Sequence, residues 1–242
     1  MRMSSPPPPG LLRRAAAELV GTAALVAVVV GSGIQATALS RDVGVQLLAN
    51  SLASALGLGL LIALLGPLSG GHLNPVVTLS EWWARRGEDG APGAREVSVY
   101  LAAQFAGAVA GALLAEAMFG RAPGTWATAV RSDSHLLLGE TVATAGLVLL
   151  VQGLRRIGRS SLAPVAVGGY LLAAIWFTSS GSFANPAGTV GRSFSDSFTG
   201  IAPASLPGFV GAQLLGALVG IALAALLYGR SEPNGSRSRR TG

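Results

Sequence analysis

Long apolar stretches recur along the chain and are separated by short polar segments. Six of them come close to the length, about 20 residues, that an α-helix needs to cross the hydrocarbon core of a bilayer. They cover residues 15–34, 43–65, 97–119, 136–151, 164–178 and 207–228. The pattern therefore predicts an all-α membrane protein with six transmembrane helices.

The order of three short motifs indicates an internal duplication. ELVGTAALV, beginning at Glu18, matches ETVATAGLV, beginning at Glu140, at six of nine positions. Two further pairs of motifs, AQxxGAxxG and NPxxT, follow in the same order in both halves. Because each unit has three spans, the second copy must enter the membrane from the opposite side, which gives an inverted repeat. We expect one membrane domain over 11–228, with repeats at about 11–120 and 134–228, and disordered tails at 1–10 and 229–242.

Paired glycines in the AQxxGAxxG motifs predict close helix contacts. Gly107 and Gly111 in the first repeat, and Gly216 and Gly220 in the second, are spaced one helical turn apart. Such small-residue faces let helix backbones approach closely in lipid. We expect a packing role for them.

Composition excludes several classes of protein. Of 242 residues, 50% are hydrophobic and 12% are charged, against about 25% charged in soluble domains. The absence of cysteine removes disulfides, thiolate metal sites and thiol nucleophiles. Since the few polar groups in the spans form no nucleophile–base pair and no metal cluster, we expect no enzymatic activity, no cofactor and no metal.

The charge is basic because of arginine alone, with 17 basic residues and a formal net charge of +6. Six spans put both termini on one side. If that side is the cytoplasm, thirteen arginines lie inside and four lie outside, namely Arg41, Arg121, Arg131 and Arg192. This is the asymmetry of the positive-inside rule. It explains the basic charge without a nucleic-acid partner and predicts a multi-pass plasma-membrane protein with both termini cytoplasmic.

Two Gly- and Ser-rich segments run into Asn-Pro, at 69–78 (SGGHLNPVVT) and 181–192 (GSFANPAGTVGR). Asn is a favoured helix N-cap and Pro is favoured at the first helical position. The helices that follow, expected over 75–84 and about 186–198, are too short to span a bilayer. We therefore predict two re-entrant half-helices.

Inverted symmetry would bring the N-termini of these half-helices face to face at the midplane. Each terminus carries roughly half a positive charge, and Asn74 and Asn185 would offer side-chain N–H donors. A solute oxygen could accept hydrogen bonds there, whereas a cation would meet an electrostatic barrier. The arrangement favours a conduit for small, uncharged, hydroxylated molecules.

These features together resemble the aquaporin (major intrinsic protein) family over about residues 11–228. The resemblance rests on two Asn-Pro-Ala-type boxes, the SGxHxNP lead-in, the two early-span glutamates and the duplicated unit. The boxes are Asn74, Pro75 and Val76, and Asn185, Pro186 and Ala187. Val76 departs from the usual alanine. The resemblance implies six helices plus two half-helices, a pore through each protomer for small neutral solutes, and a homotetramer in the lipid bilayer.

Glu18, Glu140 and His72 have two readings each. An ionisable group within a membrane is a functional candidate, so the glutamates could be proton relays. The resemblance instead implies that each carboxylate accepts hydrogen bonds from its neighbouring re-entrant loop, which is the role we expect. We likewise expect His72 to pack within its loop and not to act as a switch or ligand.

The second box lacks a residue that the resemblance would lead one to expect. Water- and glycerol-selective members typically carry Arg directly after the second box, where this chain has Gly188. By spacing, the family's outer filter would be lined by Ser54, Ala173, Ser182 and Gly188, which are all small. The segment SFANPAGTVGRSFSDSF also resembles a bacterial branch associated with arsenic resistance. This implies a wide filter for water, glycerol-sized polyols and neutral metalloid hydroxides such as arsenous acid.

Arg192 follows Gly188 by about one helical turn. Its side chain could swing into the mouth of the pore in place of the missing arginine. We favour a solvated or loop-anchoring role for it.

Three functions are therefore open. The favoured one is a passive channel with a wide mouth. A proton-coupled transporter would need Glu18 or Glu140 to titrate and to face a cavity, and a non-conducting structural membrane protein would show no solute flux.

Overall fold

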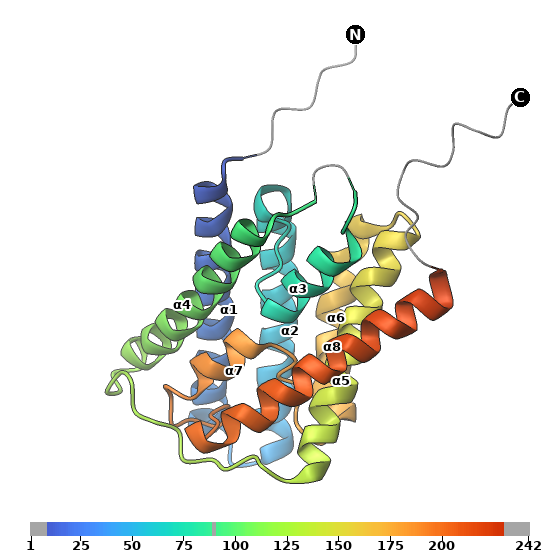
Figure 1. Cartoon of the computed structure of the whole chain (residues 1–242). Helices are drawn as coiled ribbons and strands as arrows, with labels where there is room; N and C mark the ends of the chain where they lie inside the picture. The colour runs from blue at the N-terminus through green and yellow to red at the C-terminus, as the bar shows by residue number, and fades with distance from the viewer. Residues whose placement is uncertain (1–8, 89–90, 230–242) are drawn as a thin grey trace, which may run out of the picture.

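The computed structural model describes residues 9–88 and 91–229 and is built of α-helices (Figure 1). The long helices are α1 (Leu11–Leu39), α2 (Val43–Ser69), α4 (Ala94–Met118), α5 (Ser134–Arg156), α6 (Ala163–Phe177) and α8 (Leu206–Tyr228). The short helices are α3 (Pro75–Ala84) and α7 (Pro186–Arg192), and the 3-10 turns η1 (Ser160–Leu162) and η2 (Pro203–Ser205) precede α6 and α8. Six segments are long and apolar enough to cross a membrane, if η1 is counted with α6. The predicted six spans and two half-helices are confirmed, while the predicted tails lie almost wholly outside the described residues.

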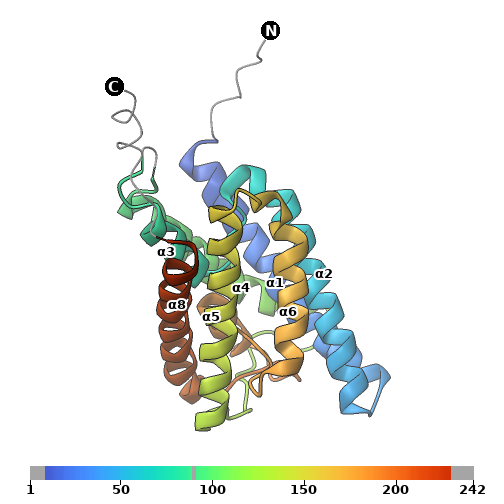
Figure 2. The ribbon, with the colours of Figure 1, turned by 90° about the vertical axis from the view of Figure 1, so that its right-hand side faces the viewer.

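The two repeats pack in the same way. In the first, α1 packs most extensively against α4, and in the second α5 packs against α8. The halves meet along α2 and α6, which run side by side (Figure 2). The short helices α3 and α7 lie between the long ones: α3 contacts α4, α5 and α8, and α7 contacts α1, α4 and α8.

Glycines set the closeness of the helix pairs within each repeat. A Cβ atom at Gly216 or Gly220 of α8 would lie 2.5 Å from the carbonyl oxygen of Thr141 or Ala145 on α5. Gly107 and Gly111 meet the backbone of α1 in the same way. Only a residue without a side chain lets the backbones come so near.

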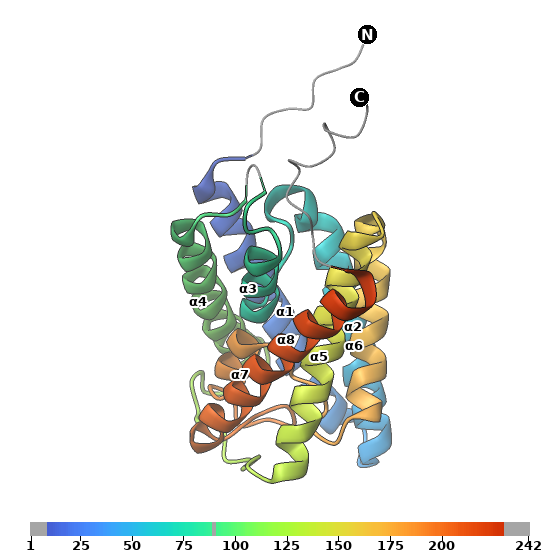
Figure 3. The same ribbon diagram turned by 45° about the vertical axis from the view of Figure 1, so that its right-hand side comes forward.

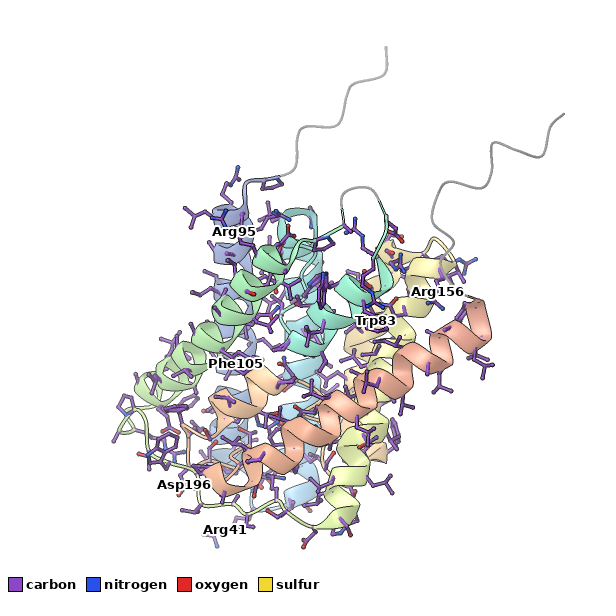
Figure 4. All side chains as sticks on the ribbon, in the orientation of Figure 1. Arg41, Trp83, Arg95, Phe105, Arg156 and Asp196 are labelled. Carbon is purple, nitrogen blue, oxygen red and sulfur yellow. The ribbon has the colours of Figure 1, made fainter. Side chains whose placement is uncertain are left out.

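The outer surface is apolar along the helices and charged at their ends. On α2, leucines at four-residue spacing are exposed, namely Leu52, Leu56, Leu60 and Leu64. Figure 4 places Arg95 and Arg156 at one end of the bundle and Arg41 and Asp196 at the other. An exposed leucine stripe between charged ends is the surface of a protein immersed in lipid.

One predicted boundary was wrong. The second half-helix ends at Arg192, not near Phe198. Beyond it, the chain bonds to the loop before α5: the Ala127 amide donates to the Ser193 carbonyl oxygen at 2.9 Å, and the Thr128 amide donates to the Asp196 carboxylate at 2.9 Å. The chain after Arg192 is thus bonded to a distant loop and does not continue α7.

Candidate functional site

The short helices α3 and α7 begin at the centre of the bundle, where their N-termini face each other (Figure 3). Each starts with proline after an asparagine cap. The Asn74 side-chain oxygen accepts from the Val76 amide at 3.0 Å, and that of Asn185 accepts from the Gly188 amide at 3.1 Å. The capping leaves both side-chain NH₂ groups pointing away from their own helices.

Each asparagine also bonds to the opposite repeat. Asn74 Nδ2 donates to the Ala184 carbonyl oxygen at 2.8 Å, and Asn185 Nδ2 donates to the Leu73 carbonyl oxygen at 2.9 Å. Leu73 and Ala184 have φ angles of 50° and 46°, a conformation uncommon outside glycine. Because an amide NH₂ carries two hydrogens, each asparagine keeps one donor for a solute.

The carboxylate of Glu18 holds the first re-entrant loop. One oxygen accepts from the Ser69 hydroxyl at 2.6 Å and the His72 amide at 3.0 Å. The other accepts from the Leu73 amide and from Gln104 Nε2, both at 2.7 Å. Four donors therefore surround this fully buried side chain.

Glu140 does the same for the second loop. It accepts from the amides of Phe183 and Ala184 at 2.8 and 2.9 Å, and from Gln213 Nε2 at 2.7 Å. Gln213 also donates to the Thr189 hydroxyl at 2.8 Å. Like Glu18, Glu140 is fully buried and is not among the residues that line the cavity described next.

A cavity of about 920 Å³ passes between the two half-helices. Glu81 and Arg85 line the cavity at the end of the bundle where α1 begins, and Arg131 lines it at the opposite end. Asn74 and Asn185 line its middle. Residues from both ends of the bundle thus border one space. A solute moving through it would pass both asparagines.

His72 belongs to the loop and also to the cavity wall. Its Nδ1 lies 3.1 Å from the Thr78 hydroxyl, and its ring packs edge-on against Tyr100 with centroids 5.7 Å apart. It is half-buried and lines the cavity. Val76, by contrast, is fully buried behind Asn74 among Val148, Ala217 and partly buried Ile221.

Three of the four residues assigned to the outer filter line the cavity, and one does not. Ser54, Ser182 and Gly188 border it. The assignment of Ala173 was wrong: it is exposed and does not line the cavity, whereas the lining residues of α6 at this level are Tyr170, Leu171, Ile175 and Trp176. Positions two residues apart differ by about 200° around a helix, so a count along the chain did not place Ala173 on the correct face.

The two serine hydroxyls assigned to the filter are buried and unpartnered. Ser54 is 1% exposed and Ser182 is 3% exposed. Within the part of the chain that the structure describes, neither side-chain oxygen has a hydrogen-bond partner. Each oxygen has less than 1 Å² of exposed surface, so both residues border the cavity without presenting an accessible hydroxyl to it.

Arg131 and Arg192 also line the cavity, and the sequence did not reveal this for Arg131. The Arg192 guanidinium carbon lies 3.2 Å from the centroid of the Phe183 ring, and its Nε donates to the Thr199 carbonyl oxygen. The bond to Thr199 gives Arg192 a contact with the following loop, and its half-buried side chain borders the cavity. Burial lowers the pKa of Arg131, while the charge of Glu140 raises it.

The described residues contain no cluster of three side chains suited to hold a metal ion. The polar groups that line the cavity include amide and guanidinium donors, the imidazole of His72 and, at one end, the carboxylate of Glu81. Such a set can bind and orient an uncharged oxygen-bearing solute.

Comparisons with known proteins agree with this geometry. The family model described as major intrinsic protein matches residues 8–179. Aquaglyceroporin AqpS of Rhizobium meliloti (strain 1021) is 45% identical over 221 residues, 91% of this chain and 92% of the relative. Probable aquaporin AqpM of Archaeoglobus fulgidus is 34% identical and 73% of each chain is covered. The X-ray structure of the aquaglyceroporin from Plasmodium falciparum has the same fold, with a TM-score of 0.66 at 20% identity over 91% of this chain and 96% of that chain. The chain belongs to the major intrinsic protein family, whose members are channels and not enzymes.

Proposed function

We propose that the protein is a wide-mouthed passive channel for water, glycerol-sized polyols and neutral metalloid hydroxides such as arsenous acid. The observation that carries the proposal is the cavity that passes Asn74 and Asn185 and reaches Gly188 at its outer end. Donors at the centre suit a hydroxylated solute. Gly188 leaves room for one larger than water.

The space at Gly188 supports the size of the proposed solute. A Cβ atom at this position would have three atoms of Asn185 as its nearest neighbours, at 3.4 to 3.6 Å. These are ordinary contact distances, and Gly188 itself borders the cavity. The relative from Rhizobium meliloti, which is named an aquaglyceroporin, agrees with a polyol-sized permeant.

The assignment of the glutamates also supports passive transport. Each carboxylate is buried and accepts at least three hydrogen bonds from its loop and the neighbouring helices. A proton relay needs access to water or to a chain of exchangeable groups. Glu18 and Glu140 are therefore proposed to hold the Asn-Pro turns and not to couple transport to protons.

The test is solute flux in proteoliposomes. Stopped-flow swelling should show faster entry of water and glycerol than in empty liposomes, and arsenous acid should equilibrate across the membrane. The flux should be the same with and without a pH gradient. Accumulation driven by the gradient would instead establish a proton-coupled transporter, and no flux after verified reconstitution would leave a structural role.

We further propose that the protein forms a homotetramer in the plasma membrane, with both termini in the cytoplasm. The described ends of α1 and α8 lie on the same side of the bundle (Figure 1). Most of the arginines described lie on that side too. Cross-linking in native membranes and protease access to a terminal tag would test the assembly and the orientation.

A further inference from the structure

One stripe of α2 forms part of the cavity wall. Its members recur every three or four residues, namely Val43, Leu47, Asn50, Ser54, Leu58 and Ile62. This is the spacing of one face of an α-helix. The exposed leucines of α2, such as Leu52 and Leu56, do not belong to this stripe. Since α2 begins just after Arg41, at the outer end of the bundle (Figure 4), Asn50 lies on the cavity face about one turn outside Ser54.

Contacts with α1 fix the orientation of the Asn50 side-chain amide. Its Nδ2 donates to the Val29 carbonyl oxygen and to the Ser32 hydroxyl oxygen, both at 2.8 Å. A carbonyl oxygen can only accept, so the nitrogen of the amide must lie on this side. The Ser32 hydroxyl donates its own hydrogen to the Val28 carbonyl oxygen at 2.6 Å, so it accepts from Asn50. Both N–H groups of Asn50 are therefore used within the protein.

The side-chain oxygen of Asn50 is left as an uncommitted acceptor. Among the residues that the structure describes, none donates a hydrogen bond to Asn50 Oδ1. Asn50 is 6% exposed, and its Oδ1 is not among the polar atoms that are both unpartnered and sealed from the surface, as the hydroxyl oxygens of Ser54 and Ser182 are. Because Asn50 lies on the cavity stripe of α2, this oxygen is accessible from the cavity.

A hydroxyl group of a solute needs an acceptor as well as a donor. Asn74 and Asn185 offer N–H groups at the centre, which bind the solute's oxygen atoms and leave the hydrogens of its O–H groups unmatched. Asn50 Oδ1 supplies an acceptor in the outer half of the same cavity. An amide oxygen also carries no net charge, so it does not attract cations as a carboxylate would.

We infer that Asn50 is a specificity-determining residue of the pore, whose Oδ1 accepts a hydrogen bond from an O–H group of a neutral polyhydroxylated solute. The inference rests on the proposed channel function, and it adds a position that spacing from the Asn-Pro boxes did not indicate. A polyol displaces the water that would otherwise bind its hydroxyls, so an unmatched O–H group slows its entry. A water molecule that loses the contact can bond to another water instead.

The experiment compares Asn50→Leu with wild type and measures glycerol and water permeability on the same proteoliposome preparation. Leucine is close to asparagine in size but cannot accept a hydrogen bond. Gln46→Leu is the matched control on the same helix. Gln46 is 8% exposed and donates from Nε2 to the Ser40 carbonyl oxygen at 2.7 Å, but it does not line the cavity. Each variant thus loses one buried amide, and only Asn50→Leu loses an acceptor in the pore.

We expect Asn50→Leu to lower the ratio of glycerol to water permeability by about two- to tenfold, the effect of one hydrogen bond. Gln46→Leu should keep the wild-type ratio, even where its midpoint of thermal unfolding falls as far as that of Asn50→Leu. An Asn50→Leu channel that conducts water with the wild-type ratio would overturn the inference and leave the channel function intact, and so would an equal fall of the ratio in Gln46→Leu. If Asn50→Leu fails to insert, Asn50→Met serves the same comparison. Wild type that conducts no glycerol would instead refute the proposed polyol channel itself.

Discussion

Asn185 donates its side-chain amide to the carbonyl oxygen of Leu73, 2.9 Å away in the other repeat. Asn74 returns the bond to Ala184 at 2.8 Å. These two bonds tie the two repeats together at the centre of the bundle, where both half-helices begin. They also fix the direction of the N–H that each asparagine keeps for the pore.

Asn185→Asp removes this donor with almost no change in shape. The remaining oxygen can still cap α7 through the Gly188 amide, but the new carboxylate oxygen would face the Leu73 carbonyl oxygen. We expect a loss of about 1–3 kcal/mol of stability, seen as a lower midpoint of thermal unfolding in detergent. An unchanged midpoint would mean that the bond between the repeats contributes no stability.

Glu140→Gln should destabilise the second re-entrant loop. The amide NH₂ of glutamine would point at donors, namely the amides of Phe183 and Ala184 or the side chain of Gln213. An unsatisfied buried pair of donors costs about 1–3 kcal/mol. Both the unfolding midpoint and glycerol flux should fall. Asp133→Asn, at an exposed carboxylate whose side chain makes no capping bond, is the control and should change neither.

Gly220→Ala and Gly211→Ala test the packing of α8 on α5. A methyl group at 220 would meet the Ala145 carbonyl oxygen at 2.5 Å, whereas one at 211 would meet nothing within 4 Å. Overpacking at 220 should cost about 1–3 kcal/mol. Alanine at 211 should stabilise the helix by about 0.5–1 kcal/mol. Opposite shifts of the unfolding midpoint are the expected result, and equal shifts would contradict the close approach.

Leu171→Cys and Ala173→Cys test the register of α6. The chain has no cysteine, so each variant carries a single thiol. Leu171 lines the cavity, while Ala173 lies on the opposite face of the helix. A water-soluble methanethiosulfonate reagent should block glycerol flux through Leu171→Cys and spare Ala173→Cys. If the reagent blocked glycerol flux only through Ala173→Cys, Ala173 would line the pore, as the spacing along the chain predicted.

Gly188→Arg should narrow the outer mouth. A Cβ at this position meets Asn185 at ordinary contact distance, and Gly188 borders the cavity, so we expect the long side chain to extend into it. Flux of larger polyols should fall by at least about tenfold, while water flux changes much less. Gly188→Ala, which fits at ordinary contact distance, is the control. Equal reduction of all solutes would show that residue 188 does not select by size.

The sequence alone determined the number of spans, the duplication and the position of the Asn-Pro turns. Apolar length, repeated motifs and the capping preferences of Asn and Pro are local properties, so they could be read without coordinates. The start of each half-helix was therefore predicted to the residue, at Pro75 and Pro186.

Only the tertiary structure decided which residues face the cavity at its outer end. Helix α6 is apolar on every side, so its pattern does not reveal which face points inward, and Ala173 was misplaced for that reason. Arg131 lies more than 50 residues before Phe183 and Arg192, and no spacing rule brings it to the same ring. The end of α7 also depended on bonds to a distant loop. Contacts between distant segments arise from packing the whole chain, which is why the pattern along it could not specify them.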